Sequence, residues 1–139
     1  MTDMAWYWLL VAHIIGDYML QSDWMAQQKT SSSWPALAHA AMYSLPFVGL
    51  HALRIFPWSV WLLIIPVSHF VIDRWRLARY VCWAKNFIAP RRWNHPWAEC
   101  SATGYHKDRP AWLSVWLLII TDNGMHLTCN GIAVWLASS

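Results

Sequence analysis

The sequence predicts an all-α fold: a single domain over residues 1–139 that forms an integral membrane bundle of about four transmembrane helices. Hydrophobic residues make up 58% of the chain and charged residues 12%, whereas ordinary soluble domains carry about 25% charged residues. The 13 Trp side chains suit the boundary between lipid and water. Four apolar runs approach the roughly 20 residues that a membrane helix needs.

Each predicted span is delimited by residues that begin or end helices. Polar residues at 21–23 close the first run. Ser33 can cap the second span, and Pro35 suits its first turn. Pro57 and Pro110 precede the third and fourth spans. The predicted spans are therefore about residues 4–20, 34–53, 58–72 and 111–136.

Positive charge is concentrated between the third and fourth spans, where eight of the ten basic residues lie. Because Lys and Arg are enriched in cytoplasmic loops, the sequence predicts a multi-pass protein of the bacterial inner (cell) membrane with both termini non-cytoplasmic. The basic segment at about 82–109 is expected on the cytoplasmic membrane surface. Within it, His95, Cys100 and His106 have a spacing that matches no zinc module.

Seven ionisable residues inside or beside the apolar runs carry the functional prediction. Six of them form three pairs at a spacing of four residues, which places both members of a pair on one helix face. An ionisable residue in lipid is costly, at about 2.5–3.5 kcal/mol for a central Asp, so these groups are expected to share a compensating partner. The predicted metal ligands are His13, Asp17, His39, His69, Asp73, Asp122 and His126.

The donor set predicts one or two divalent metal ions, with Zn or Mn favoured, because imidazole and carboxylate are their usual ligands. A two-metal centre with a bridging Asp would activate water and hold the attacking and leaving oxygens of a phosphoester. The predicted catalytic carboxylates are Asp17, Asp73 and Asp122. Arg76 and Lys29 are expected to bind phosphate. Gln21 is expected to form a hydrogen bond with a metal-ligating side chain and so orient it.

The same residues carry a family resemblance. The pattern consists of HIIGDYMLQSDW at 13–24, Lys29, His39, HFVID at 69–73 and DNGMH at 122–126. It resembles bacterial and phage integral membrane proteins of the domain-of-unknown-function family numbered 3307. That family usually has Asp-Gln where this chain has Asp-Asn in the last block, and a Lys where this chain has Arg76. The resemblance implies a phage or prophage origin and supplies no activity. The His-xxx-Asp pattern is also similar to membrane-embedded metal-dependent hydrolases.

Three functions remain open on the sequence. The first is a membrane-embedded, metal-dependent hydrolase that acts on a phosphoester from the cytoplasmic side. Its expected partners are membrane lipid, a phosphorylated lipid or nucleotide-like substrate and a second copy of the chain, with no direct nucleic-acid binding. The second is a non-enzymatic phage-type inner-membrane interaction factor with a structural His/Asp metal site or polar cluster. The third, an ion-conducting bundle, is disfavoured because the outer half of the predicted bundle is apolar.

Overall fold

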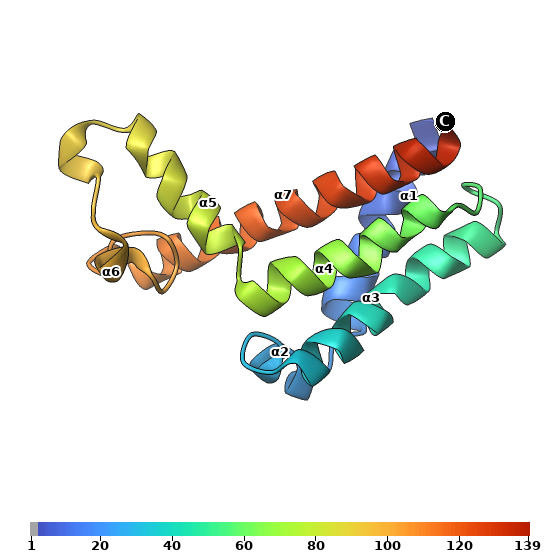
Figure 1. Cartoon of the computed structure of the whole chain (residues 1–139), viewed down its shortest axis with the longest axis horizontal. Coiled ribbons are helices and arrows are strands. Elements are labelled where there is room, and N and C mark those ends of the chain that lie inside the picture. The colour runs from blue at the N-terminus through green and yellow to red at the C-terminus, as the bar shows by residue number, and fades with distance from the viewer. Residues whose placement is uncertain (1–2) are drawn as a thin grey trace. The chain divides into compact units, whose positions relative to one another are not determined.

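The computed structural model describes residues 3–139, and none of these lies in a β-strand (Figure 1). The all-α part of the prediction is therefore confirmed. Short π and 3₁₀ segments, of which η1 (Ile15–Met19) and η2 (Val60–Leu63) matter below, interrupt the α-helices. The α-helices are α1 (Asp3–Ile14), α2 (Asp23–Gln28), α3 (Ser33–Ala52), α4 (Ile64–Trp75), α5 (Ala78–Lys85), α6 (Trp97–Cys100) and α7 (Ala111–Ser138).

The predicted transmembrane bundle is wrong, since no helix among residues 3–139 combines the length and the apolarity needed to cross a bilayer. The predicted multi-pass location in the bacterial inner membrane, with non-cytoplasmic termini, is wrong for the same reason. Two of the apolar runs yield regular helices of only 12 residues, α1 and α4, because η1 and η2 take up the rest. The α3 and α7 helices are longer, but His, Pro, Asp and Asn side chains within them lower their mean hydropathy.

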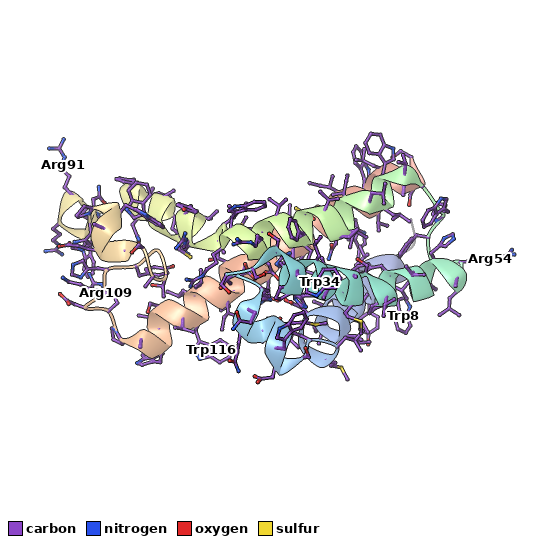
Figure 2. The ribbon with its side chains drawn as sticks, turned by 60° about the horizontal axis from the view of Figure 1, so that its bottom comes forward. Trp8, Trp34, Arg54, Arg91, Arg109 and Trp116 are labelled. Atoms are coloured by element: carbon purple, nitrogen blue, oxygen red, sulfur yellow. The ribbon has the colours of Figure 1, made fainter. Side chains whose placement is uncertain are left out.

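The chain divides into two compact units, one from the N-terminus to Trp75 together with His126–Ser139, and the other from Arg76 to Met125. In the first unit, α3 packs against α1, η1, α2 and α4. Apolar side chains of these helices and of the end of α7 form its core. The core residues are Leu9, Ala12, Tyr43, Phe47, Leu50, Phe56, Ile65, Ala133 and Val134. Trp8 packs against this core, while Trp34 is 70% exposed (Figure 2).

A glycine lets η1 approach α3 closely. A Cβ atom on Gly16 would lie 2.6 Å from the carbonyl oxygen of Tyr43 and 3.0 Å from its Cα. Only glycine leaves room for a neighbouring backbone at this distance. The next residue, Asp17, is consequently carried into the interior of the first unit, where it is 5% exposed.

The second unit contains the short helices α5 and α6, the turns that join them, and the first half of α7. Asn86 follows α5 and donates to the carbonyl groups of Cys82 and Gly104. Gly104 has a φ of +84°, and a Cβ atom there would meet the backbone of Arg79. The chain after α6 therefore turns back tightly against α5.

Candidate metal site

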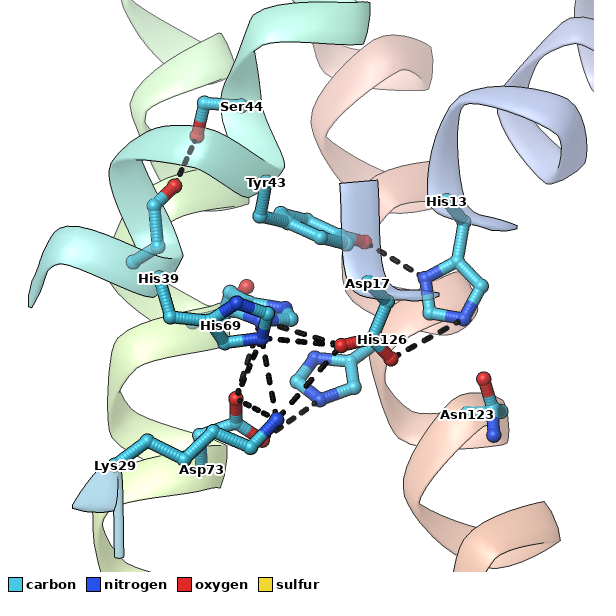
Figure 3. A network of polar contacts seen from close by, with 12 residues as sticks. His13, Asp17, Lys29, His39, Tyr43, Ser44, His69, Asp73, Asn123 and His126 are labelled. Carbon is cyan, nitrogen blue, oxygen red and sulfur yellow. Dashed lines mark hydrogen bonds and ion pairs between the residues drawn. The ribbon is translucent and has the colours of Figure 1, made fainter. Parts of the chain in front are cut away.

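Four buried side chains of the first unit converge on one point from three helical segments (Figure 3). Asp17 comes from η1, His39 from α3, and His69 and Asp73 from successive turns of α4. Each side chain is at most 7% exposed. One ligand atom from each lies within 4.8 Å of the others. These four groups could hold a metal ion.

The spacing of the donor atoms fits tetrahedral coordination. His39 Nε2 lies 3.1 Å from Asp17 Oδ1 and 3.3 Å from Asp73 Oδ2. His69 Nε2 lies 3.8 Å and 3.2 Å from the same two oxygens. Donors that surround a tetrahedral ion at about 2.0–2.1 Å are about 3.3–3.4 Å from one another. The four measured separations bracket this value.

One donor atom of the cluster lacks a hydrogen bond. His69 Nε2 makes none with any described residue, although Asp73 Oδ2 is 3.2 Å away, and a buried polar atom without a hydrogen bond costs about 1–3 kcal/mol. Asp73 Oδ2 is ion-paired with Lys29 Nζ at 2.9 Å. A metal ion at the shared point would give His69 Nε2 a partner and would compete with Lys29 for Asp73 Oδ2.

Both carboxylates are held in the ionised form. Burial alone would raise the pKa of Asp17, but the hydrogen bond with His39 and the charge of Lys29 outweigh it and lower the pKa. Burial also opposes ionisation of Asp73, yet contacts with His126, His39 and His69 hold its pKa well below the usual range. The site therefore offers two anionic ligands at neutral pH.

The pKa values of the two imidazoles are shifted in opposite directions. Burial would lower the pKa of His39, but hydrogen bonding to Asp17 and Asp73 raises it above its ordinary value. Burial lowers the pKa of His69 to about 4, so this ring is neutral at pH 7. His69 is thus ready to ligate a metal ion, whereas a metal ion at His39 would compete with the proton that the two carboxylates favour.

Lys29 supplies a cation at the solvent-facing side of the four-residue cluster. Its Nζ lies 2.9 Å from Asp73 Oδ2, 3.1 Å from His39 Nε2 and 3.8 Å from Asp17 Oδ1. The side chain is 17% exposed, more than any of the four clustered side chains. Ser22 accepts a hydrogen bond from Met25 N and caps α2, the helix that Lys29 follows. Sequence reasoning assigned Lys29 to phosphate binding but did not foresee these contacts.

A buried tyrosine, Tyr43, was missed on the sequence. Its ring stacks on His69 with centroids 3.7 Å apart. Its hydroxyl accepts a hydrogen bond from Asn130 at 2.6 Å and lies 2.9 Å from His13 Nδ1. Tyr43 follows His39 by four residues on α3, so helical periodicity was the signal that could have identified it.

The hydroxyl of Tyr43 sets the tautomer of His13. Because this hydroxyl accepts from Asn130, its own proton is available to His13 Nδ1. Neutral His13 then carries its proton on Nε2, which faces Asp17 Oδ2 at 3.9 Å. His13 therefore lies beside Asp17 Oδ2, the carboxylate oxygen that is not part of the four-residue cluster. Residues in this position commonly orient a metal-ligating side chain.

The remaining predicted residues lie outside the four-residue cluster. His126 Nε2 is 3.5 Å from Asp73 Oδ1, the oxygen that faces away from His39 and His69. Asp122 precedes His126 by one turn of α7 and belongs to the second unit. Arg76 also belongs to that unit, where it donates to the carbonyl of Ala102. The Oε1 atom of Gln21, in the turn after η1, is buried and makes no hydrogen bond with a described residue.

The backbone departs from regular α-helix where it carries Asp17. Residues 15–19 form a π turn, closed by a hydrogen bond from Leu20 N to Ile15 O. Single π turns inside helices occur often at functional sites, because the wider turn redirects a side chain. Sequence reasoning expected uninterrupted α-helix here.

Comparison with known proteins identifies a family but no activity. A family model described as "Protein of unknown function (DUF3307)" matches residues 6–135. No curated protein and no solved structure matches the chain.

Proposed function

Because the chain belongs to the DUF3307 family, whose description names no activity, we propose a function from the geometry: a metal-dependent hydrolase that acts on a phosphoester. The spacing of Asp17, His39, His69 and Asp73 carries this proposal, since four donors at 3.1–3.8 Å fit one divalent ion. The nitrogen and oxygen donors favour Zn or Mn. A divalent ion held there would lower the pKa of a water molecule and offset negative charge on a phosphoryl oxygen.

The charges at the site favour an anionic ligand. In the protein without metal, the Lys29 ammonium lies beside both carboxylates, and their contacts with His39 favour protonation of that ring. With a divalent ion in place and His39 neutral, the cationic charge exceeds the carboxylate charge by one. A phosphoester anion would restore the balance, and charge-assisted hydrogen bonds from the Lys29 ammonium would bind it.

Each polar residue then has a distinct task. His39 would hold the ion through Nε2 of its neutral ring. Asp73 presents Oδ2 to the ion, while His126 holds Oδ1. The Tyr43 hydroxyl keeps His13 oriented toward Asp17. Lys29, at the exposed side, is the residue that an entering substrate meets first.

Burial of the site favours a second candidate, a structural metal in a non-enzymatic interaction protein. His39 and His69 are almost completely inaccessible to solvent, and four protein ligands leave no open position on a tetrahedral ion. Mn, which accepts more ligands, would keep positions for water and substrate. The two functions therefore differ in whether the ion turns over a substrate.

The test is hydrolysis of p-nitrophenyl phosphate by the full chain after chelator treatment and reloading with Zn or Mn. We expect turnover by the reloaded wild type and reduction to the uncatalysed background in Asp73→Asn. The matched control is Asp23→Asn, because Asp23 is exposed and its carboxylate accepts hydrogen bonds from Gln27, away from the four-residue cluster. Bound metal without hydrolysis in the wild type would reject the hydrolase and leave the structural role.

A further inference from the structure

We propose a second divalent-metal site in the second unit, formed by His95, Glu99 and His106. One ligand atom from each of the three lies within 4.8 Å of the other two. The rings of His95 and His106 have centroids 4.1 Å apart. All three residues are half-buried, so an ion from solution can reach them. The sequence analysis grouped the two histidines with Cys100 as possible ligands. In the structure, the third residue beside them is Glu99.

Contacts outside the cluster hold the three residues in place. The carbonyl of His95 accepts a hydrogen bond from Trp83 Nε1 at 3.0 Å. The carbonyl of Glu99 accepts from Lys107 N at 3.0 Å. The tight turn at Gly104 brings the chain back so that His106 meets Glu99. The arrangement is therefore preorganised by backbone contacts, as a metal site requires.

An unsatisfied nitrogen is the independent sign of a ligand. His95 Nε2 is buried and makes no hydrogen bond with any described residue. Glu99 Oε2, by contrast, is 3.1 Å from His106 Nε2. A cation bound between the three side chains would give His95 Nε2 a partner and would take the place of the hydrogen bond between His106 Nε2 and Glu99 Oε2.

His106 Nδ1, the ring nitrogen that does not face Glu99, lies beside Asp108. Asp108 N donates to His106 Nδ1 at 3.3 Å, so the neutral ring keeps its proton on Nε2. An ion at Nε2 would require the other tautomer, in which Nδ1 carries the proton, loses the contact with Asp108 N and donates instead to Asp108 Oδ2, 3.5 Å away. A carboxylate behind a histidine ligand is a common feature of zinc sites.

The small core of the second unit gives such an ion a structural purpose. Among Arg76–Met125, the fully buried apolar residues are Ala78, Cys82 and Cys100. Both cysteines are free, so no disulfide among the described residues supports the fold. Units of this size commonly depend on a metal or a disulfide. We infer that the ion stabilises the turns between α5 and the start of α7.

Three protein ligands leave one tetrahedral position open for a small anion or water. His95 and His106 also line a surface pocket with Arg92, Trp93, Asp108 and Arg109. The guanidinium of Arg109 lies 4.0 Å above the Trp93 ring, which fixes one cationic wall of the pocket. Arg109 is labelled in Figure 2. The chemistry of this pocket therefore favours an anionic fourth ligand.

Zinc titration of the chelator-treated full chain tests the site. Glu99→Gln keeps the shape of the side chain and its hydrogen bond with His106, so the unit should fold. We expect Glu99→Gln and His106→Ala each to lose about one equivalent of bound zinc, or to weaken that equivalent more than about tenfold. The control is His51→Ala, since His51 lies in the first unit and contacts the carbonyl of Phe56. It should bind as much zinc as the wild type. Equal zinc binding in Glu99→Gln, His106→Ala and His51→Ala would overturn the proposal.

Two further readouts separate this site from the alternatives. Asp73→Asn must leave this equivalent in place, so failure of the first site and failure of the second are distinguishable. Cobalt in place of zinc should give visible absorption bands without a thiolate charge-transfer band, because the donors are nitrogen and oxygen. A thiolate band that disappears in Cys100→Ser would assign the ion to Cys100 and overturn the proposed ligand set.

Discussion

At the scale of single residues, the site depends on how each donor is held as much as on which donors are present. Asn130, Tyr43, His13 and Asp17 form a chain of contacts that ends on the carboxylate oxygen opposite the four-residue cluster. The i,i+4 spacing on the sequence placed His13 beside Asp17 and indicated a metal ligand, which stays a prediction. The contact of His13 Nδ1 with the Tyr43 hydroxyl, which sequence spacing does not reveal, favours a positioning role instead.

Removal of the Tyr43 hydroxyl tests this chain of contacts. Tyr43→Phe keeps the ring that stacks on His69 and removes the proton donor to His13. We expect the metal affinity of the site formed by Asp17, His39, His69 and Asp73 to fall about 10–100-fold, as it does when a residue that orients a metal ligand is removed. Long-range ¹H–¹⁵N NMR of the ring nitrogens should show a proton on His13 Nε2 in the wild type and mixed tautomers in the variant.

The control for this experiment is Tyr7→Phe, because Tyr7 is 57% exposed. It should retain the wild-type tautomer and affinity. If Tyr43→Phe also retains the Nε2 tautomer of His13, the hydroxyl does not position this residue.

At the scale of elements, helix existence was predictable and helix regularity was not. Apolar runs delimited by Ser33, Pro35 and Pro110 indicated α3 and α7 with boundaries close to those observed. Sequence reasoning did not anticipate η1, because a π turn is stabilised by the packing of Gly16 on α3 and by the contacts of Asp17 rather than by local propensity. The segment that carries Asp17, η1, was thus the one whose conformation the sequence predicted least well.

Gly16→Ala tests whether close packing of η1 positions Asp17. The added Cβ would lie 2.6 Å from a backbone oxygen, which cannot move aside as a side chain can. We expect a loss of about 1–3 kcal/mol in the free energy of unfolding, measured by urea denaturation, together with weaker metal binding. Gly49→Ala is the matched control, because its Cβ would meet nothing within 4 Å.

The control should be neutral or slightly stabilising, since alanine is favoured over glycine in helices by up to about 1 kcal/mol. Equal stability of the Gly16→Ala and Gly49→Ala variants would show that the contact with Tyr43 does not constrain η1.

At the scale of the whole molecule, amino-acid composition gave a wrong prediction of membrane spans, whereas the positions of the polar residues indicated part of the site. The 58% hydrophobic content and the Trp-rich runs predicted membrane spans, but no described helix is long and apolar enough to cross a bilayer. Of the seven polar residues expected to converge, Asp17, His39, His69 and Asp73 lie together. The i,i+4 spacing indicated only which residues share a helix face, as His69 and Asp73 do, whereas the approach of Asp17, His39 and Lys29 from other segments depends on tertiary structure.

The account stands on one claim, that these four residues bind one divalent ion. Elemental analysis of the full chain, saturated with Zn or Mn and then freed of excess metal, tests it most directly. The account predicts that Asp73→Asn and Asp17→Asn each contain about one equivalent less than the wild type, and that Asp23→Asn contains the same amount. Unchanged metal content in Asp73→Asn and Asp17→Asn would contradict the claim and leave the buried groups as a hydrogen-bonded and ion-paired network.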